Sequence, residues 1–228
     1  MSGQGLVPTA AAFVKRHVWS VSLSVLAALC FARLAHQMQA GGLDPFDRRV
    51  AVWLTSRRGE WDEPMLLLTR FGSFWSMAAL CSVVVLLLCW RRRYWEAAYL
   101  AASGAGAGLW CSALKLLFQR VRPGEEALYL ISTPGSFSFP SGHAMGSAGV
   151  IASFVIAVYA VRAARGWRVL AVALGLPLVL GVAASRVYFG VHYPSDILGG
   201  QLAACAWVAA VTGWFYPRLL PAEASDAE

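Results

Sequence analysis

The sequence predicts an all-α membrane protein: a six-span transmembrane helical bundle with a short amphipathic interfacial helix between spans one and two. Of its 228 residues, 58% are hydrophobic and only 14% are charged, and the mean hydropathy is +0.58. A soluble domain of this size rarely has such a composition. The chain also contains six apolar runs of about 20 residues, the length an α-helix needs to cross a bilayer. The runs are residues 17–37, 65–90, 95–118, 143–161, 167–184 and 191–216.

The first run follows Lys15 and Arg16, so it also resembles the charged start of a signal peptide. Its apolar stretch is too long for a signal peptide, however, and the following residues 38–40 (MQA) form a poor cleavage site. We therefore expect a retained membrane span. The expected organisation is a cytoplasmic N-terminal segment (1–16), a single six-helix membrane domain (17–216) and a cytoplasmic tail (217–228).

Between the first two spans, Asp44 followed by Pro45 is a helix-start signal. Apolar residues then recur at helical spacing beside arginines, which predicts an amphipathic helix in the headgroup layer. This helix is either a packed external loop helix or a lip past which a lipid reaches a site. The apolar residues are Phe46, Val50, Trp53 and Leu54, and the arginines are Arg48, Arg49 and Arg57.

Small residues within the spans indicate helix packing. Gly104, Gly106 and Gly108 lie in the middle of the third span with no preceding strand, so we expect close helix contacts there and no nucleotide loop. The cysteines have no paired spacing, which predicts neither a disulfide framework nor a metal site, and we expect them to be buried packing residues. They are Cys30, Cys81, Cys89, Cys111 and Cys205.

Orientation follows from the basic residues that flank the spans, because cytoplasmic loops accumulate Lys and Arg. Most of them fall on one side, although the first external loop carries arginines that nearby acidic residues offset. Both termini are therefore expected in the cytoplasm. The basic residues on that side are Lys15, Arg16, Arg91, Arg92, Arg93, Arg162, Arg165, Arg168 and Arg218.

Three polar clusters fall on the opposite, external side. In the first, Lys115 and Arg122 are seven residues apart, which places both on one face at the end of the third span, and Pro123 ends the helix. Two cations on one face form an anion clamp. Alternatively, they are interfacial cations near lipid phosphates.

The second cluster, residues 140–143 (PSGH), lies where a loop turns into the fourth span. Ser141 is a natural N-cap and Gly142 lets a ligand approach the backbone, so free amides at a helix start form an oxyanion cradle. His143 can donate a proton to a departing ester oxygen. The alternative is a structural histidine at a helix start.

In the third cluster, Arg186 follows the fifth span, and His192 and Asp196 are four apart at the start of the sixth. We expect them on one helical face. A carboxylate bonded to one ring nitrogen fixes the tautomer and leaves the other nitrogen free to attack phosphorus. An interaction of Asp196 with the helix dipole is a simpler alternative, but it does not explain the histidine one turn earlier.

Together these clusters resemble the three-part signature of the type 2 phosphatidic acid phosphatase family, relatives of the vanadium haloperoxidases. The matching pattern is Lys115 with Arg122-Pro123, then PSGH at 140–143, then Ser185-Arg186 with His192 and Asp196. The resemblance implies that His192 is the nucleophile, Asp196 its orienting residue and His143 the general acid. It also implies phosphate-binding positions at Lys115, Arg122, Ser141, Gly142 and Arg186, with no metal and no cofactor.

The expected function is a phosphatase of lipid phosphates or polyprenyl diphosphates in a bacterial-type inner membrane, with its active site facing the periplasm or exterior. Undecaprenyl diphosphate, phosphatidylglycerol phosphate and phosphatidate are candidate substrates. The rivals are a lipid phosphotransferase with the same site and a non-catalytic lipid-binding or transport protein. The six spans argue against a soluble haloperoxidase. Nothing in the sequence indicates a nucleic-acid partner or an oligomeric state.

Overall fold

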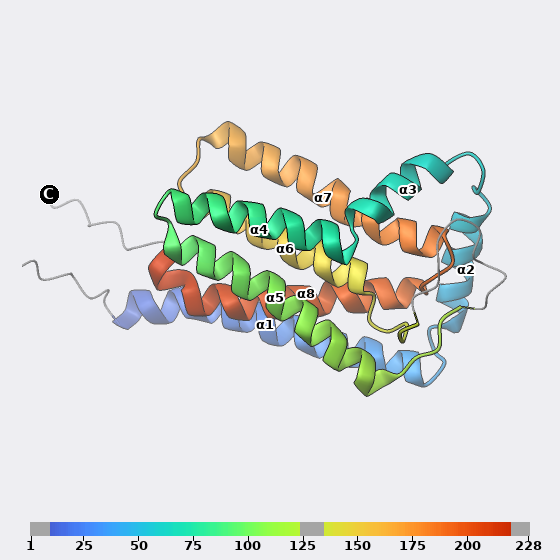
Figure 1. The fold of residues 1–228 in the computed structure, drawn as a ribbon. Helices are drawn as coiled ribbons and strands as arrows, with labels where there is room; N and C mark the ends of the chain where they lie inside the picture. The colour runs from blue at the N-terminus through green and yellow to red at the C-terminus, as the bar shows by residue number, and fades with distance from the viewer. Residues whose placement is uncertain (1–9, 124–134, 220–228) are drawn as a thin grey trace, which may run out of the picture.

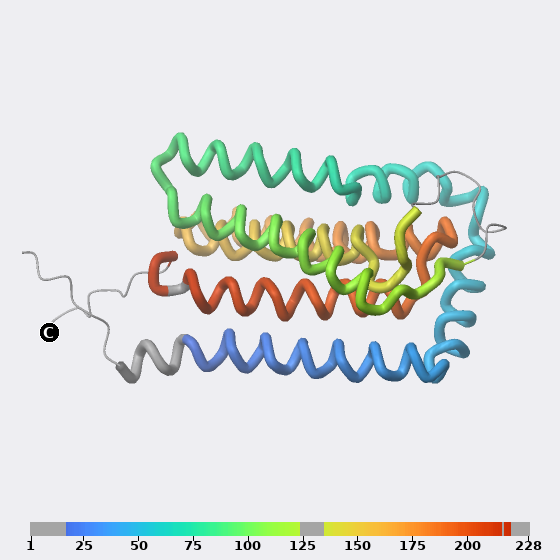
Figure 2. Tube along the Cα trace, turned by 60° about the horizontal axis from the view of Figure 1, so that its bottom comes forward, coloured from blue at the N-terminus to red at the C-terminus, as the bar shows by residue number. Residues whose placement is uncertain are grey.

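The computed structural model describes residues 10–123 and 135–219, which form helices and no strand (Figure 1). The long helices lie side by side, and α2 crosses one end of the bundle (Figures 1 and 2). The predicted all-α bundle is therefore confirmed. The helices are α1 (Ala10–Gln39), α2 (Asp44–Thr55), α3 (Asp62–Phe71), α4 (Phe74–Trp90), α5 (Tyr94–Phe118), α6 (Gly142–Ala160), α7 (Arg165–Tyr188) and α8 (Pro194–Leu219).

The second expected span is broken into two helices. Within the described residues, α1, α5, α6, α7 and α8 are each long and apolar enough to cross a membrane, whereas α3 and α4 pass this test only as a pair bent by 52°. Ser73 explains the break, because its backbone is extended and its side chain accepts from the Ser76 N–H to start a new helix. The apolar run 65–90 is therefore two helices and not one, and the six predicted spans are obtained when the bent pair counts as one.

The break lets α3 pack against α7 while α4 packs against α5. Gly72 lies so close to α7 that a Cβ atom there would sit 2.1 Å from Cγ1 of Val182. A side chain at this position would therefore push the two segments apart. The contact brings the α3 residue Thr69, which is buried, next to the C-terminal end of α7.

Helix α8 packs against α1, α5 and α6. The glycine prediction holds for two of the three positions. A Cβ on Gly106 would lie 2.1 Å from the Trp207 ring, and one on Gly104 would lie 3.1 Å from the Cys81 sulfur. Gly108 has no such neighbour within 4 Å, so the expected packing role is wrong there.

The predicted interfacial helix is confirmed as α2. Leu54 packs against the buried ends of the spanning helices, whereas Phe46 and Trp53 remain largely exposed. The helix also turns one acidic residue, Asp47, inward, and only 3% of its surface is exposed. A buried carboxylate in an interfacial helix needs a partner.

Several boundaries and burial predictions require correction. Helix α7 runs to Tyr188, so Arg186 lies within its last turn, and α8 begins at Pro194 because proline is suited to a first helical turn. Cys111 is buried as expected, but Cys30 and Cys205 are exposed on the outside of the bundle. The parts of the predicted terminal segments at residues 1–9 and 220–228 lie outside the described residues.

Candidate active site

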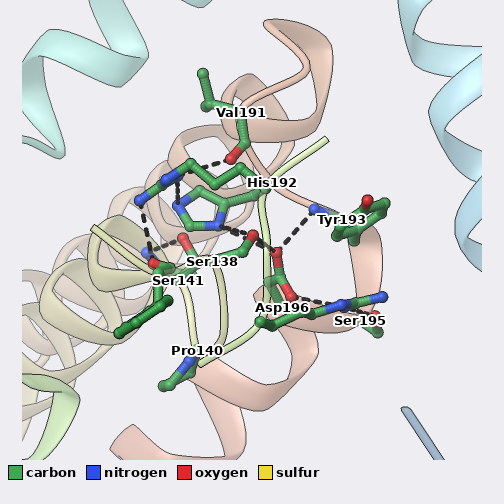
Figure 3. Close-up of polar contacts among 12 residues, drawn as sticks. Ser138, Pro140, Ser141, Val191, His192, Tyr193, Ser195 and Asp196 are labelled. Carbon is green, nitrogen blue, oxygen red and sulfur yellow. Dashed lines mark hydrogen bonds and ion pairs between the residues drawn. The ribbon is translucent and has the colours of Figure 1, made fainter. Parts of the chain in front are cut away.

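The three polar clusters meet at the end of the bundle where α2 lies. His192 reaches this point from the turn between α7 and α8 (Figures 1 and 3). The turn is closed by a hydrogen bond from the Val191 N–H to the Arg186 carbonyl (3.1 Å). It also needs a φ of +70° at Gly190, a conformation that glycine adopts without steric cost. The turn buries His192 to 3% exposure.

The hydrogen bonds of His192 define its tautomer. Its Nε2 lies 3.1 Å from Nη1 of Arg122, and its Nδ1 lies 3.2 Å from Oδ2 of Asp196 (Figure 3). A guanidinium can only donate, so Nε2 must accept and the ring proton must reside on Nδ1. The unprotonated Nε2 therefore faces the guanidinium of Arg122, a cation that can bind a phosphate beside the ring.

Asp196 is fully buried, and its carboxylate is fixed from several directions. Oδ2 accepts from His192, from the Tyr193 N–H (2.9 Å) and from the Ser138 hydroxyl. Oδ1 accepts from Nη1 of Arg120 at 2.7 Å. A carboxylate with this many donors is held as an anion in a single orientation.

The first predicted cluster is assembled differently from the expectation. Helix α5 ends at Phe118 with Gln119 in a left-handed conformation, so Lys115 and Arg122 do not share a helical face. Arg122 instead returns from the following loop, and both cations donate to the carbonyl oxygen of Phe137. The prediction of proximity is correct, but its helical explanation is wrong.

Arg186 supplies the third cation from the last turn of α7. Its Nη1 donates to the hydroxyl of Thr69 (2.5 Å), while its Nε has no partner among the described residues. Because Arg186 is only 4% exposed, an unused donor here is free to bind an anion. The positive charge of the pocket thus comes from Lys and Arg, and no group of three or more His, Cys, Asp or Glu in the described ranges could hold a metal ion.

The PSGH segment caps α6 as predicted. Ser141 has an extended backbone, and its hydroxyl accepts from the Ala144 N–H (3.4 Å). Its own N–H donates to the Asp196 carbonyl (3.0 Å), so this amide does not belong to the expected cradle. The first amides of a helix have no intrahelical partner, which leaves those of Gly142 and His143 for a ligand.

His143 is the second residue of α6 and is partly buried at the same pocket. It lies close to the backbone of Thr69 and within electrostatic range of Arg186, Arg122 and His192. A proton donor at this position is suited to the leaving group of a phosphate that the same cations hold.

The electrostatics of the turn favour a neutral imidazole at His192. Burial lowers the pKa of His192 to about 4, although the hydrogen bond and charge of Asp196 act in the opposite direction. At neutral pH the imidazole therefore keeps the lone pair on Nε2. Burial also disfavours charge on Arg120, but Asp196 and Asp47 outweigh it and raise the pKa of that guanidinium.

Sequence reasoning missed four residues that support this site. Asp47 lies three residues before Val50 and seven before Leu54, so all three fall on the same face of α2. An acidic residue on this apolar face was a signal that the sequence offered. The other three carry no distinguishing spacing and become visible only through their contacts. The four residues are Asp47, Arg120, Ser138 and Ser195.

Comparisons with known proteins show which family this chain resembles. The family model of the PAP2 superfamily matches residues 96–219, a range that contains all three clusters. Phosphatidylglycerophosphatase B of Bacillus subtilis is 30% identical over 177 residues, which cover 75% of this chain and 84% of that protein. Decaprenylphosphoryl-5-phosphoribose phosphatase of Mycobacterium tuberculosis is 34% identical over 176 residues, covering 71% of this chain and 87% of that protein.

A more distant relative is lipid A 1-phosphatase of Rhizobium etli, which is 32% identical over 131 residues and matches 54% of this chain and 52% of that protein. Among solved structures, the transmembrane PAP2-type phosphatidylglycerolphosphate phosphatase from Bacillus subtilis superposes with a TM-score of 0.75 at 26% identity. The match covers 84% of this chain and 95% of that one.

Proposed function

Since this chain belongs to the PAP2 superfamily, we propose that it is an integral membrane phosphatase that removes phosphate from lipid phosphates or polyprenyl diphosphates through a phosphohistidine intermediate. The observation that carries this proposal is the ring of His192, whose Nδ1 donates to Asp196 while Nε2 faces Arg122. This arrangement prepares a nucleophile beside a phosphate-binding cation.

In the proposed reaction, Lys115, Arg122 and Arg186 bind the phosphate oxygens together with the amides at the start of α6. Nε2 of His192 attacks phosphorus as the bond to the leaving oxygen breaks, and His143 gives its proton to that oxygen. Asp196 stabilises the positive charge that develops on the imidazole. Water then attacks the phosphohistidine, His143 accepts its proton, and inorganic phosphate leaves.

The substrate class follows from the position of the site. His192 and the surrounding cations lie at the end of an apolar bundle that α2 crosses, so an amphiphile can keep its chains in lipid while its phosphate reaches the cations (Figures 1 and 3). The relatives whose names refer to phosphatidylglycerophosphate, a decaprenyl carrier and lipid A support a lipid phosphate substrate. The excess of basic residues at the opposite end supports a site on the periplasmic or exterior face of a bacterial-type inner membrane.

A panel assay tests this function. Purified protein in mixed micelles with EDTA is given phosphatidylglycerol phosphate, phosphatidate and undecaprenyl diphosphate, and inorganic phosphate is measured. We expect stoichiometric release of phosphate from at least one substrate. Transfer of the phosphoryl group to an added alcohol or lipid acceptor, without release of inorganic phosphate, indicates a phosphotransferase instead. Lack of turnover of all three, with intact folding, argues against the proposed function.

The pH dependence should reflect the buried imidazole. The pKa of His192 is lowered to about 4, so the ring stays neutral between neutral pH and about pH 5. In that range we expect no loss of kcat/KM that depends on His192. Below it, kcat/KM should fall as the pH drops through about 4, because Nε2 becomes protonated. A phosphate monoester itself titrates near pH 6, so its ionisation must be measured separately by phosphorus NMR. An acidic limb near pH 6.5 that remains after this correction contradicts the buried, neutral nucleophile.

The role of His143 predicts a dependence on the leaving group. We expect His143→Ala to lower turnover of an alkyl lipid phosphate by about a hundredfold, because the leaving oxygen then departs without a proton. An aryl phosphate, whose leaving group is stable as an anion, should lose much less. Rates with both substrates are compared in the variant and in the unaltered protein. Equal losses for the two substrates are incompatible with a general acid.

A further inference from the structure

A third arginine, Arg120, lies between two buried carboxylates behind the nucleophile. Its Nη1 donates to Oδ1 of Asp196 at 2.7 Å, and its Nη2 donates to Oδ2 of Asp47 at 2.9 Å. Asp47 comes from α2 and Asp196 from α8, and both are almost completely buried. One guanidinium therefore connects the interfacial helix to the carboxylate that orients His192.

Ser195 completes this network. Its N–H and hydroxyl both donate to Asp47, at 2.8 and 2.6 Å, and its hydroxyl oxygen accepts from Nη1 of Arg120 at 2.7 Å. The guanidinium also stacks over the Tyr193 ring, 4.0 Å from the centroid. Both terminal nitrogens of Arg120 thus donate to protein groups, in contrast to Arg186, whose Nε has no partner among the described residues.

We propose that Arg120, held by Asp47 and Ser195, is a positioning residue for catalysis: it fixes the orientation and charge of Asp196 and thereby keeps the proton of His192 on Nδ1. This proposal rests on the proposed function, because it matters only if His192 attacks through Nε2. It also assigns a role to α2, which supplies the anchor for Arg120 as well as covering the pocket.

The physical reason lies in the full burial of Asp196. A carboxylate with no exposed surface is costly to keep ionised without a counter-ion, and a neutral or rotated carboxyl group no longer accepts reliably from Nδ1. Lys115 and Arg122 act on Asp196 electrostatically, but in the described structure neither donates a hydrogen bond to it. Arg120 is therefore the cation that can fix the plane of the carboxylate.

Asp47 in turn fixes Arg120. An arginine side chain has many rotamers, and its guanidinium is directed only when its other donors are engaged. Replacing Asp47 should therefore slow turnover mainly through Arg120, which makes the two residues energetically coupled. This coupling separates a positioning network from two independent structural contacts.

The kinetic test compares Arg120→Gln, Arg120→Lys, Asp47→Asn and the Arg120→Gln/Asp47→Asn double variant on phosphatidate in mixed micelles. Arg48→Gln is the matched control, because Arg48 is an exposed arginine one residue from Asp47. We expect Arg120→Gln to lower kcat by about ten- to a hundredfold, with KM changed by no more than about twofold. Arg120→Lys should recover part of the loss, and the double variant should be no slower than Arg120→Gln alone.

A spectroscopic test does not depend on the substrate. Protein labelled with nitrogen-15 in its histidines reports which ring nitrogen of His192 carries the proton, and His192→Ala identifies the signal. We expect an Nδ1-protonated ring in the unaltered protein and in Arg48→Gln, and a mixture of tautomers in Arg120→Gln. The amount of folded protein is checked for each variant by size-exclusion chromatography.

Two outcomes overturn the positioning role. In one, the losses in kcat of the two single variants multiply in the double variant. In the other, Arg120→Gln changes neither kcat nor the tautomer of His192. These outcomes differ from failure of the proposed function. If the unaltered protein turns over no lipid phosphate, the function is wrong while the tautomer measurement still decides the role of Arg120. If the unaltered protein is active and only Arg120→Gln has no effect, the function stands and this inference fails.

Discussion

Replacing His192 by alanine is expected to lower phosphate release from lipid phosphates by about a thousandfold or more, because the variant has no atom that can form the phosphoryl intermediate. Burial of His192 at 3% exposure and its lowered pKa both serve a neutral attacking nitrogen. Initial rates are measured in mixed micelles on the best substrate of the panel. The amount of folded protein is matched between variants before rates are compared.

Chemical trapping makes this test specific to the nucleophile. Protein quenched during turnover of lipid labelled with phosphorus-32 should carry an adduct that is stable in base and labile in acid, and His192→Ala should carry none. His36→Ala is a suitable control, since His36 is an exposed histidine near the end of α1. An adduct that persists in His192→Ala would assign the attack to another residue.

Changing Asp196 to asparagine should be almost as damaging, with an expected loss in kcat of about a thousandfold. The amide replaces one oxygen by a donor, and both orientations conflict with the neighbours. If its nitrogen faces His192, the ring proton must move to Nε2, which then meets the donors of Arg122. If its nitrogen faces the other way, it meets the donors of Arg120.

The Asp196→Asn variant should retain most of its phosphate binding, because the binding cations are unchanged. We therefore expect the inhibition constant of vanadate to change far less than kcat, in a comparison with Asp44→Asn, which alters an exposed aspartate of α2. A variant that loses affinity while keeping its kcat would assign Asp196 to substrate binding and contradict its orienting role.

The bundle itself was predictable because a local apolar run indicates each spanning segment. The break between α3 and α4 was harder to predict, because Ser73 acts as an N-cap inside a run that is apolar enough overall to be taken as one span. The late end of α7 has a similar cause. Arg186 is charged, yet the helix continues through it because its guanidinium donates a hydrogen bond to Thr69 on a neighbouring helix.

The site was predictable to the extent that its chemistry follows short spacings. The pairing of His192 with Asp196 was expected from their four-residue separation, although His192 lies in the turn before α8 and not on the helix. Arg122 was expected near Lys115 for a wrong geometric reason. The link from Asp47 through Arg120 to Asp196 joins residues far apart in sequence, and no local pattern of one sequence reports such a contact.

The balance of charge around the turn has a consequence for the fate of the product. Among the described residues, Lys115, Arg120, Arg122 and Arg186 face only two buried carboxylates, Asp47 and Asp196, so two positive charges remain uncompensated. A phosphate dianion neutralises them, whether it is esterified or free. Released orthophosphate therefore competes with the next lipid substrate for the same cations. Its diffusion into a dilute aqueous compartment limits this product inhibition.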